Sequence, residues 1–191
     1  MTEASDVIDL LAGLPPASAL RAARPTARDY AQKSHDALFV APAPGSMPLV
    51  ERLAVAVFVA LLHGDAPAIA RYEAPLGQCG DRGPVPDLLP ALRRVARAAA
   101  TTGPYGNGDR SGPTLRVETA AFGARLAAAL DYAHLLVFHP RDAGRAALEP
   151  LVAAGWGATE IVTLAQVVSF LCFQIRAGAG LRVLASMPAE G

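Results

Sequence analysis

The segment that begins at Thr159-Glu160 constrains the fold most, because its apolar residues follow the spacing of an α-helix. The residues that recur at intervals of three and four are Ile161, Leu164, Ala165, Val168, Leu171, Cys172 and Ile175. Phe170 and Phe173 widen the apolar surface beyond one stripe. A helix that is apolar on most of its circumference is buried on several sides. We therefore expect this helix to pack in the core and to contribute to a subunit interface.

Helical periodicity recurs along the chain, whereas strand-forming residues in alternation are scarce. Proline and glycine separate the periodic segments, and Thr26 and Asp65 stand at plausible N-cap positions. The segments predicted to be helical are 5–12, 26–39, 48–62, 66–74, 88–101, 118–138, 140–154 and a last helix from 159 that includes 161–175. The sequence therefore predicts an all-α fold.

A chain of 191 residues is long enough for one domain with a sizeable core. We expect a single domain, 1–191, with N-terminal helices in 1–45 and C-terminal helices in 118–185. Residues 101–113, TTGPYGNGDRSGP, contain several glycines and predict a flexible loop. Neither side of this loop is expected to bury its apolar face alone.

Composition excludes several classes of protein. Hydrophobic residues make up 52% of the chain and charged residues 18%, which excludes intrinsic disorder. The net charge is zero, so the balance gives no sign of binding to nucleic acid or to an anionic membrane. The longest fully apolar stretch, Leu53 to Leu62, is shorter than the ~20 residues that span a bilayer. We expect a cytoplasmic protein that binds neither nucleic acid nor membrane.

The two cysteines, Cys79 and Cys172, do not form a disulfide framework or a zinc motif. Cys172 falls on the apolar face of the last helix and is expected to be a small core residue. His134 and His139 are five residues apart, which does not suit metal binding by one helix. His35 stands beside Asp36 and is expected to be solvated. We predict no metal and no cofactor.

Two longer segments carry a family resemblance. Residues 130–184, LDYAHLLVFHPRDAGRAALEPLVAAGWGATEIVTLAQVVSFLCFQIRAGAGLRVL, resemble the C-terminal half of the alkylhydroperoxidase D-like (AhpD-like) proteins. These belong to the carboxymuconolactone decarboxylase superfamily, and the likeness is to its peroxidase-related branch. Residues 47–72, MPLVERLAVAVFVALLHGDAPAIARY, resemble the family's active-site helix pair, which we place at 47–76.

The resemblance implies an AhpD-like helical domain, a homo-oligomer (dimer, trimer or hexamer) and an antioxidant oxidoreductase ancestry. Active members carry a Glu and a Gly-Cys-x-x-Cys followed closely by His. A cysteine at a helix N-terminus is stabilised as a thiolate and attacks the peroxide, and the second cysteine resolves the sulfenic acid as a disulfide. Glu and His relay the proton.

Alignment on Gly64 places the family's first cysteine at Asp65 and its second at Ala68. The His positions fall at Arg71 or Tyr72. The Glu falls at Leu53, with Glu51 half a turn away. Both motif thiols are therefore replaced in this chain, and a thiol peroxidase cycle cannot run on Asp and Ala.

Two further functions remain open on the same fold. His63, Asp65, Tyr72 and Glu51 are candidate catalytic residues for a thiol-independent acid/base enzyme of the lyase or decarboxylase type. The alternative for Asp65 is a structural helix cap, and for Glu51 a structural salt bridge. The chain could instead be a non-catalytic binding subunit. We expect a homo-oligomer, with a small apolar molecule as a further candidate ligand.

Overall fold

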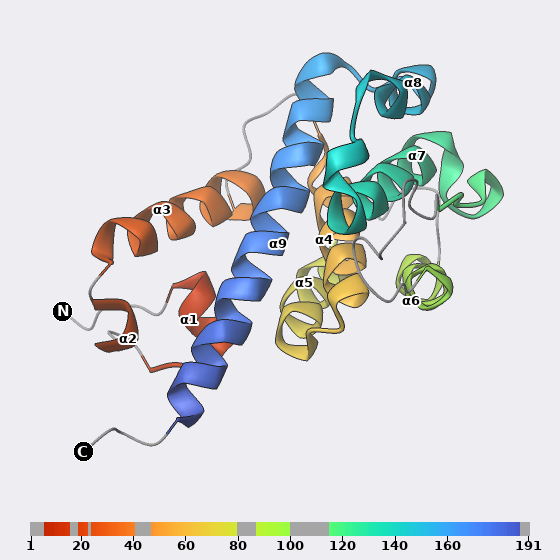
Figure 1. The fold of residues 1–191 in the computed structure, drawn as a ribbon. Helices are drawn as coiled ribbons and strands as arrows, with labels where there is room; N and C mark the ends of the chain where they lie inside the picture. Colours follow the sequence, from red (N-terminus) through yellow and green to blue (C-terminus); the bar gives the residue numbers. More distant parts are fainter. Residues whose placement is uncertain are drawn as a thin grey trace, which may run out of the picture.

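The computed structural model describes residues 6–15, 19–22, 24–40, 47–79, 87–99 and 115–187. Throughout these ranges the regular structure is helical and no strand occurs, which confirms the predicted all-α class (Figure 1). The predicted loop at 101–113 lies outside the described residues.

The helices of the N-terminal half are α1 (Val7–Ala12), α2 (Ala19–Ala22), α3 (Pro25–His35), a π-helical segment η1 (Asp36–Val40), α4 (Leu49–His63) and α5 (Ala66–Gln78). Those of the C-terminal half are α6 (Leu88–Ala98), α7 (Thr119–Phe138), a 3-10 turn η2 (Pro140–Asp142), α8 (Arg145–Ala153) and α9 (Ala158–Ser186).

Helix α4 is the centre of the core. Its residues from Ala54 to Ala60 have no exposed surface, and it packs against α5, α6, α7 and α9. Helix α9 crosses the whole molecule, with α1–α3 on one side and α4–α8 on the other (Figure 1). Because α9 contacts α1, α4 and α7, it joins the two groups of helices.

Several predicted boundaries are confirmed. Helix α4 ends at Gly64, whose φ of 64° is left-handed, and Asp65 is the N-cap of α5. Others were wrong. Helix α3 begins with Pro25 at its first position and not with Thr26 as its cap, since a proline already has the φ of a helix start and needs no N–H partner there.

Helix α5 is longer than the sequence predicts, and α9 begins where predicted, although the sequence predicts no exact end for it. Helix α5 continues through Pro75 to Gln78, because a proline close to a helix end removes only one backbone bond. Helix α9 runs for 29 residues, to Ser186, where it packs against α1.

Helices α7 and α8 are more interrupted than predicted. The backbone of Gly123, with φ 73° and ψ 156°, breaks the helical path near the start of α7. The predicted helix at 140–154 is divided into η2 and α8 by the non-helical residues Ala143 and Gly144.

Two helices, α7 and α9, are long and apolar enough to cross a membrane by length and composition alone. A core helix passes the same test, and 44% of the most apolar window of α7 and 39% of that of α9 are buried inside the protein. The cytoplasmic location stays a prediction.

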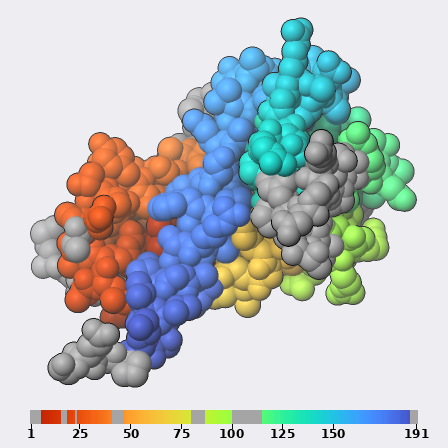
Figure 2. All heavy atoms as spheres, in the orientation of Figure 1, coloured from red at the N-terminus to blue at the C-terminus, as the bar shows by residue number. Residues whose placement is uncertain are grey.

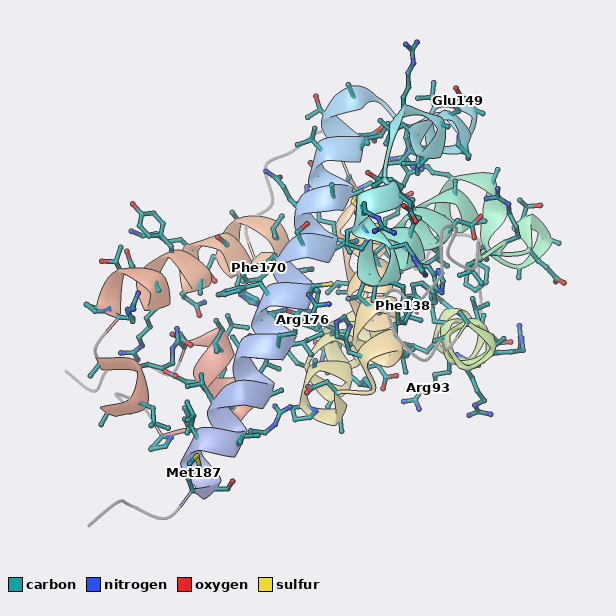
Figure 3. The ribbon with its side chains drawn as sticks, viewed as in Figure 1. Arg93, Phe138, Glu149, Phe170, Arg176 and Met187 are labelled. Atoms are coloured by element: carbon teal, nitrogen blue, oxygen red, sulfur yellow. The ribbon has the colours of Figure 1, made fainter. Side chains whose placement is uncertain are left out.

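One side of α9 stays exposed along its length. Its exposed apolar residues are Val162, Phe173, Val183 and Leu184, and Figure 3 shows Met187 at its end. The opposite side, which includes Leu164, Leu171 and Ile175, is buried. The predicted core role of α9 is thus confirmed, and its predicted role in a subunit interface stays a prediction.

Candidate functional site

The turn between α4 and α5 presents residue 65 at a helix start, as the family resemblance requires. Gly64 supplies the left-handed backbone, and the Asp65 carboxylate follows at the N-cap. Oδ1 of Asp65 accepts a hydrogen bond from the backbone N–H of Ala68, with the two atoms 3.0 Å apart. The side chain at the first cysteine position therefore caps the helix that carries the second.

The other carboxylate oxygen of Asp65 is also engaged. Oδ2 forms an ion pair with the guanidinium of Arg182 on α9. The same guanidinium donates to the backbone carbonyl of Leu11, at 2.6 Å. Asp65 is only 8% exposed. Its carboxylate thus links α5 to α9 and, through Arg182, to α1, and each of its oxygens has a structural partner.

His63, in the last turn of α4, has one engaged ring nitrogen. Nδ1 lies 2.9 Å from the carbonyl oxygen of Val59 and donates to it, whereas Nε2 is buried without a hydrogen-bond partner among the described residues. Burial lowers the pKa of His63, and the charge of Arg176 lowers it further, against the raising effects of the Val59 hydrogen bond and of Asp65. The imidazole is therefore neutral at pH 7.

Tyr72 lies in the core between α5 and α9. It is 1% exposed, and its hydroxyl accepts a hydrogen bond from Nε2 of Gln174. Burial raises the pKa of Tyr72 to about 12, although the Gln174 hydrogen bond and the charge of Arg71 both act to lower it. The phenol therefore keeps its proton at neutral pH and cannot act as a base.

Glu51 is far from the other candidates. It lies in the first turn of α4 and His63 in the last, which separates their backbones by about 18 Å. Its Oε1 pairs with Nε of Arg125 at 2.8 Å, and Arg125 also pairs with Glu160 at 2.6 Å and stacks on Trp156. Glu51 therefore belongs to an ion-pair cluster that joins α4, α7 and the start of α9.

A cavity of about 430 Å³ opens where η1 faces α5. Arg52 of α4 holds η1 in place, since its guanidinium donates to the carbonyls of Met47, at 2.8 Å, and Leu38, at 3.1 Å. The residues that line the cavity are His35, Phe39, Val40, Leu53, Ala70, Arg71, Tyr72, Ala74, Pro75 and Gln78. We refer to it as the α3–α5 cavity. Its walls are mostly apolar and its polar groups are few, as in small-molecule sites.

The most polar side of the α3–α5 cavity is the pair Arg71 and His35. Nη2 of Arg71 lies 3.5 Å from Nε2 of His35, and Nδ1 of His35 lies 3.3 Å from Oδ1 of Asp36. Nε of Arg71 is buried without a hydrogen-bond partner in the described part of the chain. Burial lowers the pKa of His35, helped by the charge of Arg71 and opposed by the bond to Asp36.

The expectation that His35 is solvated was wrong. It is 5% exposed, and its ring packs 5.6 Å from that of Phe39. The spacing of His35 and Phe39, four residues apart, places both on one helix face and was the available signal. Sequence reasoning had grouped Arg71 with the thiol site and did not connect it to His35.

Further hollows lie elsewhere among the described residues. A groove of about 680 Å³ between α7 and α9 is lined partly by Cys172, Phe173 and Arg176. Figure 3 shows Arg176 near the middle of α9, and Figure 2, in the same orientation, shows α9 along the front of the molecule. Cys172 is 7% exposed and burial raises the pKa of its thiol, as expected of a core cysteine.

A smaller cavity, of about 110 Å³, adjoins Asp131 and His134.

The described residues hold no cluster of three His, Cys, Asp or Glu side chains suited to a metal ion. His63 and Asp65 line none of the three hollows described above. The structure thus separates the four candidate residues into a helix cap, a neutral histidine, a protonated tyrosine and a distant ion pair.

Comparison with models of known protein families gives no match for this chain, and comparison with curated proteins gives none. The resemblance to AhpD-like proteins therefore stays a prediction that rests on the residues quoted for it.

Proposed function

We propose that the chain is an AhpD-like protein that binds a small molecule in place of reducing peroxides with thiols. The all-α fold and the Gly64 turn, which places residue 65 at a helix start, support the first part of this proposal. The second part rests on one observation, which is that the Asp65 carboxylate is already bound to the Ala68 amide and to Arg182.

A peroxidatic residue must be free to attack and then to be regenerated. Asp65 is instead tied to the Ala68 amide and to Arg182, and Ala68 has no reactive group. Neither remaining cysteine replaces the pair, because Cys172 is a buried thiol with a raised pKa on α9 and Cys79 follows the end of α5. The turn between α4 and α5 therefore holds no residue that can perform thiol chemistry.

Acid/base catalysis by the four candidate residues is supported less well than binding. A general base and its orienting acid must lie within hydrogen-bond reach of one another and of one substrate. His63 donates to Val59, Asp65 binds Arg182, Tyr72 is protonated, and Glu51 is at the other end of α4. The α3–α5 cavity, within the range of about 300–1,000 Å³ typical of ligand sites, favours binding.

The proposal is tested by a hydroperoxide assay with a dithiol reductant, followed by a binding measurement. We expect no dithiol-dependent consumption of peroxide above buffer, and the same result for the variant that combines Cys79→Ala with Cys172→Ala. Turnover that disappears in that variant would overturn the proposal. Binding is followed by amide chemical shifts during titration with octanamide, a neutral amphipathic probe.

A further inference from the structure

We propose that the α3–α5 cavity binds an organic monocarboxylate, with the guanidinium of Arg71 holding the carboxylate and the apolar walls holding its hydrocarbon part. This inference rests on the proposed binding function and names the class of ligand for it. Three features of the cavity support this ligand class: an arginine without an acidic partner among the described residues, a neutral histidine beside it, and apolar walls.

Arg71 carries a positive charge that no carboxylate of the described residues neutralises. Among the described residues its one hydrogen-bond contact is with His35, and its Nε is buried there without a partner. A guanidinium has five N–H donors arranged as a planar fork, and leaving one of these donors buried without a partner is costly. An anion with two coplanar oxygens would satisfy this fork in a bidentate way.

His35 favours this arrangement because it stays neutral. Nδ1 is placed to donate to Asp36, so Nε2 carries the lone pair that accepts from Arg71. A neutral imidazole orients the guanidinium without neutralising it. Nε2 of Gln32 also donates to Asp36, at 2.7 Å. This bond fixes the far end of the series of hydrogen bonds that runs from Gln32 through Asp36 and His35 to Arg71.

The remaining walls of the cavity determine which chemical group can follow the carboxylate of the ligand. Phe39, Val40, Leu53 and Pro75 offer apolar surface next to the polar pair, and Gln78 is the other polar group apart from the Tyr72 hydroxyl. The oxygen of that hydroxyl already accepts a hydrogen bond from Gln174. One cationic fork and an apolar wall fit a carboxylate on a hydrocarbon body better than they fit a phosphate ester, which needs more donors.

The test compares octanoate with octanamide, which differ in charge but share their hydrocarbon chain. Binding to the full chain is followed by amide chemical shifts at low salt. We expect octanoate to bind more tightly than octanamide. The substitution Arg71→Gln should weaken octanoate binding about tenfold or more and leave octanamide within about twofold. As a matched control, Arg94→Gln removes the same charge from an exposed site on α6 that does not line the cavity.

A second variant tests the apolar part. Ala74→Phe fills one wall and should weaken both probes, whereas Arg71→Gln should weaken only the acid. If Arg71→Gln does not fold, Arg71→Lys keeps the charge, removes the fork and should weaken octanoate by a smaller factor.

The outcomes separate the two proposals. Equal binding of octanoate by the Arg71→Gln variant and the unmodified chain would overturn the role of Arg71. Binding of octanamide but not of octanoate would overturn the carboxylate class. Both results leave small-molecule binding intact, whereas a chain that binds neither probe contradicts the binding function as well.

Discussion

The hydroxyl of Tyr72 and the side-chain amide of Gln174 meet in the core at 2.5 Å, although the two residues are 102 positions apart in the sequence. Gln174 has no exposed surface. The contact therefore gives a polar anchor between α5 and α9 among the apolar residues of the core.

Removal of this anchor is expected to destabilise the fold. Tyr72→Phe leaves the Gln174 amide without its acceptor, and a buried unsatisfied donor costs about 1–3 kcal/mol. The free energy of unfolding in urea measures the loss. The control is Tyr132→Phe, which removes a hydroxyl for which no hydrogen bond is seen in the described residues and should cost less. Equal losses for the two variants would show that the Gln174 contact contributes nothing.

Asp65 is expected to act through structure. Asp65→Asn keeps an oxygen for the helix cap but loses the charge that pairs with Arg182, whereas Asp65→Ala loses both. We expect Asp65→Ala to be less stable than Asp65→Asn by about 1 kcal/mol, the usual contribution of an N-cap. Thermal and urea unfolding of the two variants give this difference. A reversed order would rule out the cap as the main role.

Glu51 is expected to matter for stability and not for ligand binding. Glu51→Gln weakens one arm of the cluster at Arg125, where the groups are part-exposed, so we expect a loss of about 0.5–1 kcal/mol. A double-mutant cycle with Arg125→Gln should show coupling between the two residues. Octanoate affinity should not change, and a loss of binding in this variant would place Glu51 at the site after all.

Acid is expected to destabilise the fold through its buried histidines. Burial lowers the pKa values of His35, His63 and His134 in the folded state. The unfolded chain, with a histidine pKa near 6.5, therefore takes up protons first as the pH falls. The stabilisation from the neutral rings is complete above about pH 6.5 and is lost as the pH falls below it. The urea concentration at the midpoint of unfolding should decrease as the pH is lowered from 7.5 to 5.5. The decrease should be smaller in the variant His134→Gln. A flat profile would contradict the burial of these rings.

The glycine that ends α4 is expected to be required there. Gly64 has a φ of 64°, so Gly64→Ala should cost about 1–2 kcal/mol even though a methyl group would meet no atom within 4 Å. Gly180→Ala, on the exposed side of α9, is the matched change in a helical backbone and should stabilise by up to about 1 kcal/mol. Urea unfolding of both variants tests the opposite signs.

Local signals in the sequence predicted the parts of the fold that depend on local chemistry. The end of α4 at Gly64 and the cap at Asp65 follow from backbone preference and side-chain length, and both were found. The end of α9 was not predicted, because its last turns are held by Arg182 and by the packing of Gly178 against Leu11, which are long-range contacts.

The candidate site was harder to predict for the same reason. The sequence identified Asp65 as either a cap or an acid, and the bonds to Ala68 and to Arg182, which is 117 positions away, distinguish the two. The pairing of Arg71 with His35 depends on how α3 and η1 lie against α5, which no periodic pattern encodes. Residues that act through tertiary contact cannot be read from spacing along one helix.

The hydrogen bond from Arg182 to the carbonyl of Leu11 makes α1 and the last turns of α9 depend on each other. Deletion of the residues from 182 onward would remove this hydrogen bond to α1, and α1 in turn packs against α3. We expect α1 and the last turns of α9 to open as a single cooperative unit, at a lower free energy than the α4 core. Hydrogen exchange would show α1 and the last turns of α9 losing protection together.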